Sequence, residues 1–127
     1  MTLITFDMAL EALNAAVDEK GSDYVYKGGG TFCAYQEFGE PSCIVGNALH
    51  CLGVPIRTLA EMDQCSFAGS VISSRKVLDI LEDSGFVLDD DAVMLLTAAQ
   101  VLQDDAVSWG DAVRVAREET EEWYALH

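Results

Sequence analysis

The sequence is short of basic residues and of long apolar runs, and each shortage excludes a class of protein. Only 7 lysines and arginines stand against 22 aspartates and glutamates, for a formal net charge of −15. Such a surface repels phosphate groups, so we expect no direct nucleic-acid binding and no binding to anionic membranes. No apolar run approaches the ~18 residues that cross a bilayer. Residues 1–7 also lack the basic region and apolar core of a secretory signal, so we expect a cytoplasmic protein.

What the chain does contain is enough apolar material for one hydrophobic core. Hydrophobic residues make up 50% of its 127 residues, which argues against a disordered chain. There is no repeat or low-complexity linker, and the Gly28–Gly30 run is too short to separate domains. We therefore expect residues 1–127 to form a single globular domain.

Hydrophobic periodicity predicts a mainly α fold of about five helices with a small β-hairpin, a single α+β domain. Phe6, Leu10, Leu13 and Val17 mark the first helix, with Thr5 or Asp7 as its N-cap and Gly21 at its end. The aromatic segments 24–26 and 32–35 predict the hairpin near residues 23–36. Later helices are predicted after Ser42, from Val71, and after Asp89 and Ser108, with a short helical segment from Pro55 to Met62 and residues 86–88 as a connector or strand. The predicted core is Phe6, Leu10, Leu13, Val45, Leu49, Leu78, Leu81, Leu95, Leu96, Ala99 and Val113.

Several short strings occur together in a recognisable order. They are Asp23-Tyr24-Val25-Tyr26, Cys33-x-Tyr35, the run Pro41-Ser42-Cys43-Ile44-Val45-Gly46-Asn47-Ala48-Leu49, Ala99-Gln100-x-x-Gln103-Asp104, and Trp109-Gly110-Asp111-Ala112-Val113. Over most of residues 6–117 the chain resembles a family of small uncharacterised proteins of actinobacteria and their tailed phages. The resemblance implies no activity, cofactor or catalytic residue. It implies instead a non-structural accessory protein that acts inside a bacterial host.

Cysteine chemistry is the first candidate for a functional site. Without a secretory signal, we expect the four cysteines to be reduced and mostly buried. If Ser42 caps its helix, Cys43 lies in the first turn, where the helix dipole favours the thiolate and makes it the candidate reactive thiol. His50 is seven residues further on, about 10 Å along a helix, which is too far for a thiolate–imidazole pair. A buried structural role for Cys43 is the competing interpretation.

A zinc site is a second alternative. Cys33, Cys43, His50 and Cys51 contain the ligand types of a Cys₃His site. The close Cys-x-x-Cys pair typical of zinc sites is absent, and the neighbours His50 and Cys51 point about 100° apart on a helix. We therefore expect no metal and no other cofactor.

Acidic residues are concentrated in the last part of the chain. Residues 79–127 carry 13 acidic and 2 basic residues, a net charge of −11. Many of these acids lie at predicted helix C-termini, where the dipole makes negative charge unfavourable. They form the candidate interaction face: Asp104, Asp105, Glu118, Glu119, Glu121 and Glu122. The competing interpretation is an ordinary solvated surface.

Three functional hypotheses follow. The first is a non-enzymatic accessory protein that binds a host protein. The second is an acidic DNA mimic that occupies a nucleic-acid-binding protein, and whose binding would collapse with salt. The third is an enzyme or zinc protein built around Cys43. The sequence favours the first, and leaves the partner and the oligomeric state open.

Overall fold

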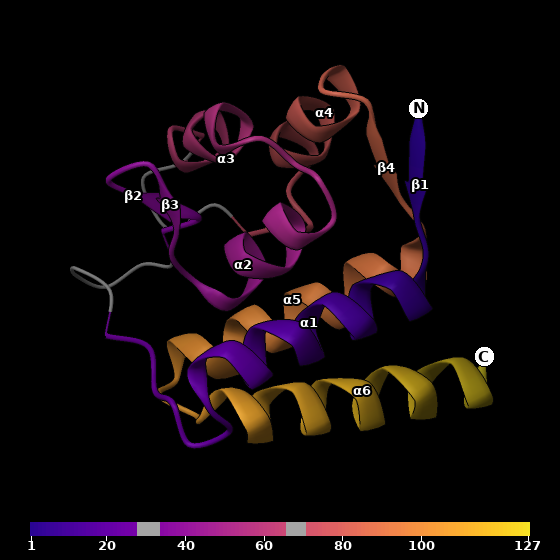
Figure 1. The fold of residues 1–127 in the computed structure, drawn as a ribbon. Helices are drawn as coiled ribbons and strands as arrows, with labels where there is room; N and C mark the ends of the chain where they lie inside the picture. The colour runs from indigo at the N-terminus through magenta and orange to yellow at the C-terminus, as the bar shows by residue number, and fades with distance from the viewer. Residues whose placement is uncertain (28–33, 66–70) are drawn as a thin grey trace.

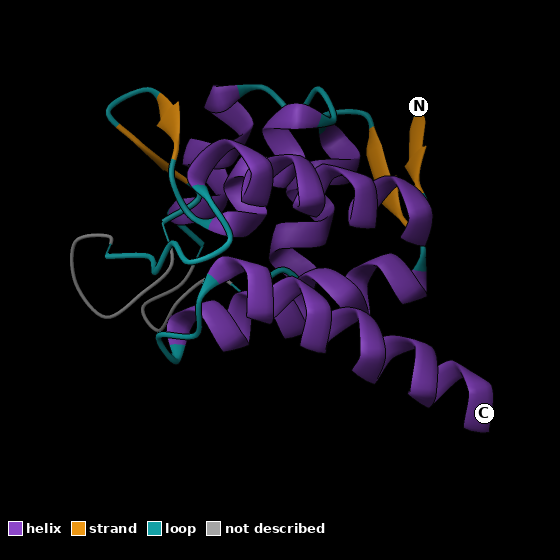
Figure 2. Ribbon diagram, turned by 60° about the horizontal axis from the view of Figure 1, so that its bottom comes forward, coloured by secondary structure: helices purple, strands orange, loops and turns teal. Residues whose placement is uncertain are grey.

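The computed structural model describes residues 1–27, 34–65 and 71–127, and these residues form a mainly helical domain. Figure 2 shows that helices make up most of it, with strands confined to two short pairs. In chain order the elements are β1 (Thr2–Ile4), α1 (Phe6–Lys20), β2 (Gln36–Glu37), β3 (Glu40–Pro41), α2 (Ile44–Cys51), α3 (Ile56–Asp63), α4 (Arg75–Asp83), β4 (Phe86–Leu88), α5 (Asp90–Asp104) and α6 (Trp109–Leu126). The predicted fold class is confirmed.

The helices form two layers. The long helices α1, α5 and α6 lie side by side and contact one another, while α2, α3 and α4 lie over them (Figure 1). α5 and α6 are joined by a short turn and run in opposite directions, so the end of α6 lies beside the start of α5 (Figure 1). No helix in the described part of the chain has the length and apolar character that crossing a membrane requires.

Local signals determine the ends of α1. The Thr5 hydroxyl accepts a hydrogen bond from the Met8 backbone N–H at 3.2 Å, as an N-cap does. Gly21 ends the helix with a φ of 97°, a conformation that costs a glycine little. The sequence predicted both the Thr5 N-cap and the Gly21 end. Asp7, the alternative N-cap, lies in the first turn of the helix instead.

The hairpin is formed by a later segment than predicted, residues 36–41 instead of the aromatic segments 24–26 and 32–35. β2 and β3 pair antiparallel, with Gln36 opposite Pro41 and Glu37 opposite Glu40. Neither predicted strand is found in the described residues: 24–26 and 34–35 form no strand, and residues 28–33, which include the start of the second predicted strand, lie outside the described residues. The pair β1–β4 has a different topology: it is parallel, with Leu3 opposite Val87. Residues 86–88 are thus a strand, whereas the strand at residues 2–4 was not predicted.

Most of the predicted core is buried, with three corrections. Leu13, Val45, Leu49, Leu81, Leu95, Leu96, Ala99 and Val113 are buried. Phe6 and Leu10 are only partly buried, at the edge of the core. On α4 the buried pair is Val77 and Leu81, one helical turn apart, and Leu78 is half-buried beside it.

A buried polar cluster around Tyr35 connects the two layers. The Tyr35 ring is fully buried, its hydroxyl accepts a hydrogen bond from Gln100 Nε2 at 3.2 Å, and its backbone N–H donates to Asp63 at 2.7 Å. Gln100 Oε1 also accepts from the Ile72 backbone N–H at 3.2 Å. Gly46 packs so closely here that a Cβ on it would overlap the Tyr35 carbonyl oxygen. The cluster therefore requires a glycine at position 46 and a hydroxyl at position 35.

Candidate interaction surface

The last turns of α6 extend beyond the rest of the domain. Earlier in the helix a buried face of Ala112, Val113, Ala116 and Thr120 packs against the neighbouring helices. From residue 121 onward every residue is exposed, and the ribbon projects past the other helices (Figures 1 and 2). We call residues 121–127 the α6 tip. The tip has no buried face, so the core does not explain its side chains.

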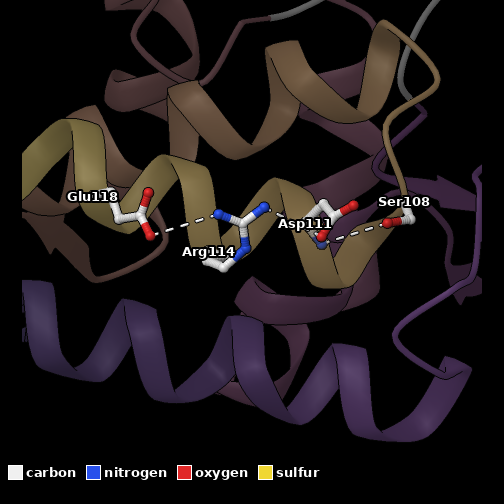
Figure 3. A network of polar contacts seen from close by, with 4 residues as sticks. All are labelled: Ser108, Asp111, Arg114 and Glu118. Atoms are coloured by element: carbon white, nitrogen blue, oxygen red, sulfur yellow. Dashed lines mark hydrogen bonds and ion pairs between the residues drawn. The ribbon is translucent and has the colours of Figure 1, made fainter.

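The N-terminal part of α6 is held by a local polar network (Figure 3). The Ser108 hydroxyl caps the helix by accepting from the Asp111 backbone N–H at 3.4 Å. Arg114 then forms ion pairs with Asp111 at 3.4 Å and with Glu118 at 3.6 Å. These side chains are about half exposed, so each pair stabilises the helix by only a few tenths of a kcal/mol.

Ion pairing leaves part of the acidic set without a cation. Arg117 pairs with Glu121 at 3.6 Å, as Arg114 does with Glu118. Glu119 and Glu122 form no ion pair with any residue in the described part of the chain. Carboxylates that lack an intramolecular partner are free to contact a basic group on another molecule.

The α6 tip also carries large apolar side chains in water. Trp123 is 43% exposed, Tyr124 41% and Leu126 74%. Trp123 stacks on the His127 ring with centroids 4.2 Å apart, and it meets Tyr124 edge-on at 4.9 Å. Trp123 therefore lies on the projecting part of the helix and is not among the buried residues of α6. Trp and Tyr are the side chains most enriched at energetically important positions in protein interfaces.

Two aspartates from α5 join this surface. Partial desolvation, and then the negative charges of Asp90 and Asp91, raise the pKa of the Tyr124 hydroxyl. The start of α5 therefore lies within electrostatic range of Tyr124. Their effect on Tyr124 depends on the antiparallel packing of α5 and α6.

The six acids predicted to form one face are divided between two places. Glu118, Glu119, Glu121 and Glu122 lie on the distal half of α6. Asp104 and Asp105 lie at the end of α5, next to the start of α6, and more than 9 residues of helix, about 13 Å, separate the groups. Burial raises the pKa of Asp104, whose carboxylate accepts a hydrogen bond from Gln103 Nε2 at 3.0 Å. The six acids of the candidate interaction face therefore form two groups, an acidic end of α6 and a separate pair at the end of α5.

Cys43 is not the free thiol that was predicted. Its side chain is fully buried and disulfide-bonded. Cys43 itself, and not Ser42, is the N-cap of α2, and its sulfur accepts from the Gly46 backbone N–H at 3.4 Å. A buried sulfur in a disulfide carries no thiolate, so the reactive-thiol hypothesis for Cys43 is not supported.

The remaining cysteines also differ from expectation. Cys51 is free and exposed, and Cys65 is free and half-buried, whereas we expected mostly buried residues. The ring of His50 contacts the Val54 carbonyl oxygen at 3.2 Å, at the far end of α2 from Cys43. Cys33 lies outside the described residues. Within residues 1–27, 34–65 and 71–127, no three His, Cys, Asp or Glu side chains are placed to hold a metal ion.

The α6 tip with Asp90 and Asp91 is therefore the best candidate for a functional surface on geometric grounds. Its residue types favour binding over catalysis: carboxylates, aromatic rings and one aliphatic side chain, all accessible from solvent. Comparisons of this chain with protein-family models, with curated proteins and with solved structures found no match.

Proposed function

We propose that this chain is a non-enzymatic accessory protein that binds a host protein in the bacterial cytoplasm through the α6 tip. One observation carries the proposal: Trp123, Tyr124 and Leu126 are exposed on a helix end that the rest of the domain does not cover. Burying an aromatic or leucine side chain completely gains about 1.5–3 kcal/mol, and here the fold obtains only part of that gain, because Trp123, Tyr124 and Leu126 remain 43%, 41% and 74% exposed. A partner that covers the tip would obtain it.

Charge complementarity favours a basic partner. The aromatic rings lie among the carboxylates of Glu119, Glu122, Asp90 and Asp91. A second copy of this chain would bring two such acidic surfaces together in a protein of net charge −15, so like-charge repulsion opposes self-association. A protein with an apolar pocket bordered by lysine or arginine fits the tip better. The resemblance to phage and actinobacterial proteins supports a bacterial host protein as that partner.

The DNA-mimic hypothesis is the second candidate, and the same carboxylates support it. A mimic presents rows of negative charge, and the acidic end of α6 supplies one short row. Asp104 and Asp105 lie apart from these glutamates, so the row of negative charge is shorter than the six predicted acids would make. The exposed rings add an apolar contribution that a pure phosphate mimic does not need. We therefore place protein binding through the rings first.

The test is an affinity capture from an actinobacterial lysate with three baits: the parent chain, a Trp123→Ala/Tyr124→Ala variant and a Glu119→Lys/Glu122→Lys variant. We expect one host protein that survives a high-salt wash with the parent and is lost with the aromatic variant. A nucleic-acid-binding protein that is released by salt and lost only with the charge variant would favour the mimic. A partner retained equally by all three baits would contradict binding through the tip.

A further inference from the structure

A second exposed aromatic side chain lies at the opposite end of the molecule from the α6 tip. The β2–β3 hairpin and the end of α6 lie on opposite sides of the fold (Figure 1). Phe38, in the turn of this hairpin, is 101% exposed. It borders a cleft of about 300 Å³, here called the aromatic cleft, whose other rings are Tyr24, Tyr26 and Pro41.

Phe38 is an unfavourable residue for its own turn. The two-residue turn has φ values of 54° at Phe38 and 79° at Gly39. Positive φ at both central positions defines a type I′ turn, which strongly favours Asn-Gly. A phenylalanine there combines backbone strain with an apolar ring in water. Asparagine would suit the hairpin better, so the benefit of the phenyl ring lies outside the isolated chain.

The polar groups of the aromatic cleft are rich in hydrogen-bond donors. The hydroxyls of Tyr26 and Ser42 lie 2.7 Å apart, and whichever donates in this bond, the other keeps its own proton for a ligand. Burial raises the pKa of the Tyr26 hydroxyl, which at an ordinary value of about 10 is already protonated near neutral pH. Lys20, whose Nζ lies 5.9 Å from the centre of the Tyr24 ring, and Lys27 add two ammonium groups. Neither lysine forms an ion pair within the described residues.

The β2–β3 hairpin forms one side of the cleft and contributes negative charge, opposite to that of the two lysines. Glu37 and Glu40 flank the Phe38 turn and also line the cleft. The cleft as a whole thus offers the exposed Phe38 ring, the half-buried rings of Tyr24 and Tyr26, donors for carbonyl oxygens, and carboxylates for one cation. Proline-rich segments in the polyproline II conformation have this complementary chemistry, because they present pyrrolidine rings and carbonyl acceptors and have few N–H donors.

We propose that the aromatic cleft binds an extended proline-rich peptide segment that carries a basic residue. The rings of Tyr24, Tyr26 and Phe38 pack against the prolines. The hydroxyls and lysines donate to the peptide carbonyl oxygens, and Glu37 or Glu40 receives the basic side chain. The α6 tip takes no part in this site, so the proposal stands independently of the proposed function of that tip.

The first test is a titration of the isotopically labelled protein, followed by NMR. The probe is an acetylated and amidated peptide of one arginine followed by prolines, about eight residues long. The control peptide has glycine and serine in place of the prolines. We expect chemical-shift changes at residues 24–27 and 37–42 with the proline peptide alone. No change at these residues, an equal response to both peptides, or stronger binding of an acidic peptide would overturn the proposal.

The decisive variant is Phe38→Asn, because it separates a binding role from a structural one. Asparagine relieves the turn, so we expect this variant to unfold at a higher urea concentration than the parent and yet to bind the peptide about tenfold more weakly. Trp123→Ala, at the other end of the molecule, is the matched control and should leave peptide binding unchanged. If Phe38→Asn binds the proline peptide as tightly as the parent does, the ring is not part of a peptide site.

Discussion

The Tyr35 cluster and the α6 tip both combine aromatic rings with carboxylates, and they use them in opposite ways. In the cluster the ring is fully buried, and Asp63 accepts from the backbone N–H groups of Tyr35 and Gln36 at 2.7 and 3.2 Å. At the tip the ring of Trp123 is 43% exposed and no described cation pairs with Glu119 or Glu122. The same residue types therefore serve folding where they are covered and are available for binding where they are not.

The largest predicted effect tests the close packing of the Tyr35 cluster. Gly46→Ala places a Cβ into the Tyr35 carbonyl group. Because backbone must move to relieve the overlap, we expect the free energy of unfolding to fall by about 3 kcal/mol or more. Urea denaturation followed by circular dichroism measures it. Gly39→Ala is the control, since only its φ of 79° is unfavourable, and should cost about 1 kcal/mol. Equal costs for the two variants would contradict close packing at Gly46.

Removal of one hydroxyl tests the hydrogen bonds of the cluster. Tyr35→Phe keeps the buried ring and leaves the Gln100 amide without the acceptor that it reaches at 3.2 Å. Loss of a buried hydrogen bond costs about 0.5–1.5 kcal/mol, and we expect a loss of stability in that range with partner binding at the α6 tip unchanged. A stability equal to that of the parent would show that the Tyr35–Gln100 hydrogen bond contributes nothing.

The pH dependence of stability provides a third, smaller effect. Burial raises the pKa values of Asp63 and Asp104 above 3.8. A carboxyl group whose pKa is raised by folding stabilises the native state fully below its unfolded pKa, and this contribution is lost as the pH rises through the folded pKa. Protonation of carboxylates also reduces the repulsion among negative charges in a chain of net charge −15, and this too stabilises the folded state as the pH falls. We therefore expect the urea midpoint to rise as the pH falls from neutral toward the ordinary pKa range of aspartate, about 4.

Asp104→Asn isolates one of the two groups in this experiment. The asparagine retains an oxygen that can accept from Gln103, but it does not titrate. We expect the rise in the urea midpoint on acidification to be smaller for this variant than for the parent. An identical pH profile would show that Asp104 contributes nothing, and a midpoint that falls on acidification would contradict the direction of both pKa shifts.

The smallest effect on stability is predicted at the α6 tip. Trp123→Ala/Tyr124→Ala removes rings that are 43% and 41% exposed and lie beyond the core, so the free energy of unfolding should change by about 0.5 kcal/mol or less. Affinity for the captured partner should fall about 100-fold, since interface aromatic residues dominate binding energy. A large loss of stability would instead indicate that the rings support the fold.

Elements with local signals were predicted well. The first helix carries an N-cap, an apolar stripe and a terminal glycine within its own length, and its observed ends at Phe6 and Lys20 follow from them. The strand at residues 2–4 was missed because three residues show no usable alternation, and its partner Phe86–Leu88 lies far along the chain. Short parallel pairs of this kind depend on the packing of the helices between them.

The candidate sites were predicted less well, for a related reason. Glu118, Glu119, Glu121 and Glu122 are close together in sequence and remain together on the helix. Asp90 and Asp91 join them only through the packing of α5 against α6, and the same packing carries Asp104 and Asp105 to the other end. Exposure of Trp123 could not be read from its helical spacing, because a periodic pattern does not show where the neighbouring helices end.

The amino-acid sequence by itself determined the acidic character, the mainly helical class and the ends of helices such as α1, because charge, apolar period and capping act over a few residues. The tertiary structure alone decided which side chains are covered. It buried Tyr35 against Gly46, enclosed Cys43 in the core as a disulfide-bonded N-cap, and left the α6 tip and Phe38 in water. Burial depends on contacts between segments far apart in the chain, and in this protein burial separates the residues that stabilise the fold from those available to a partner.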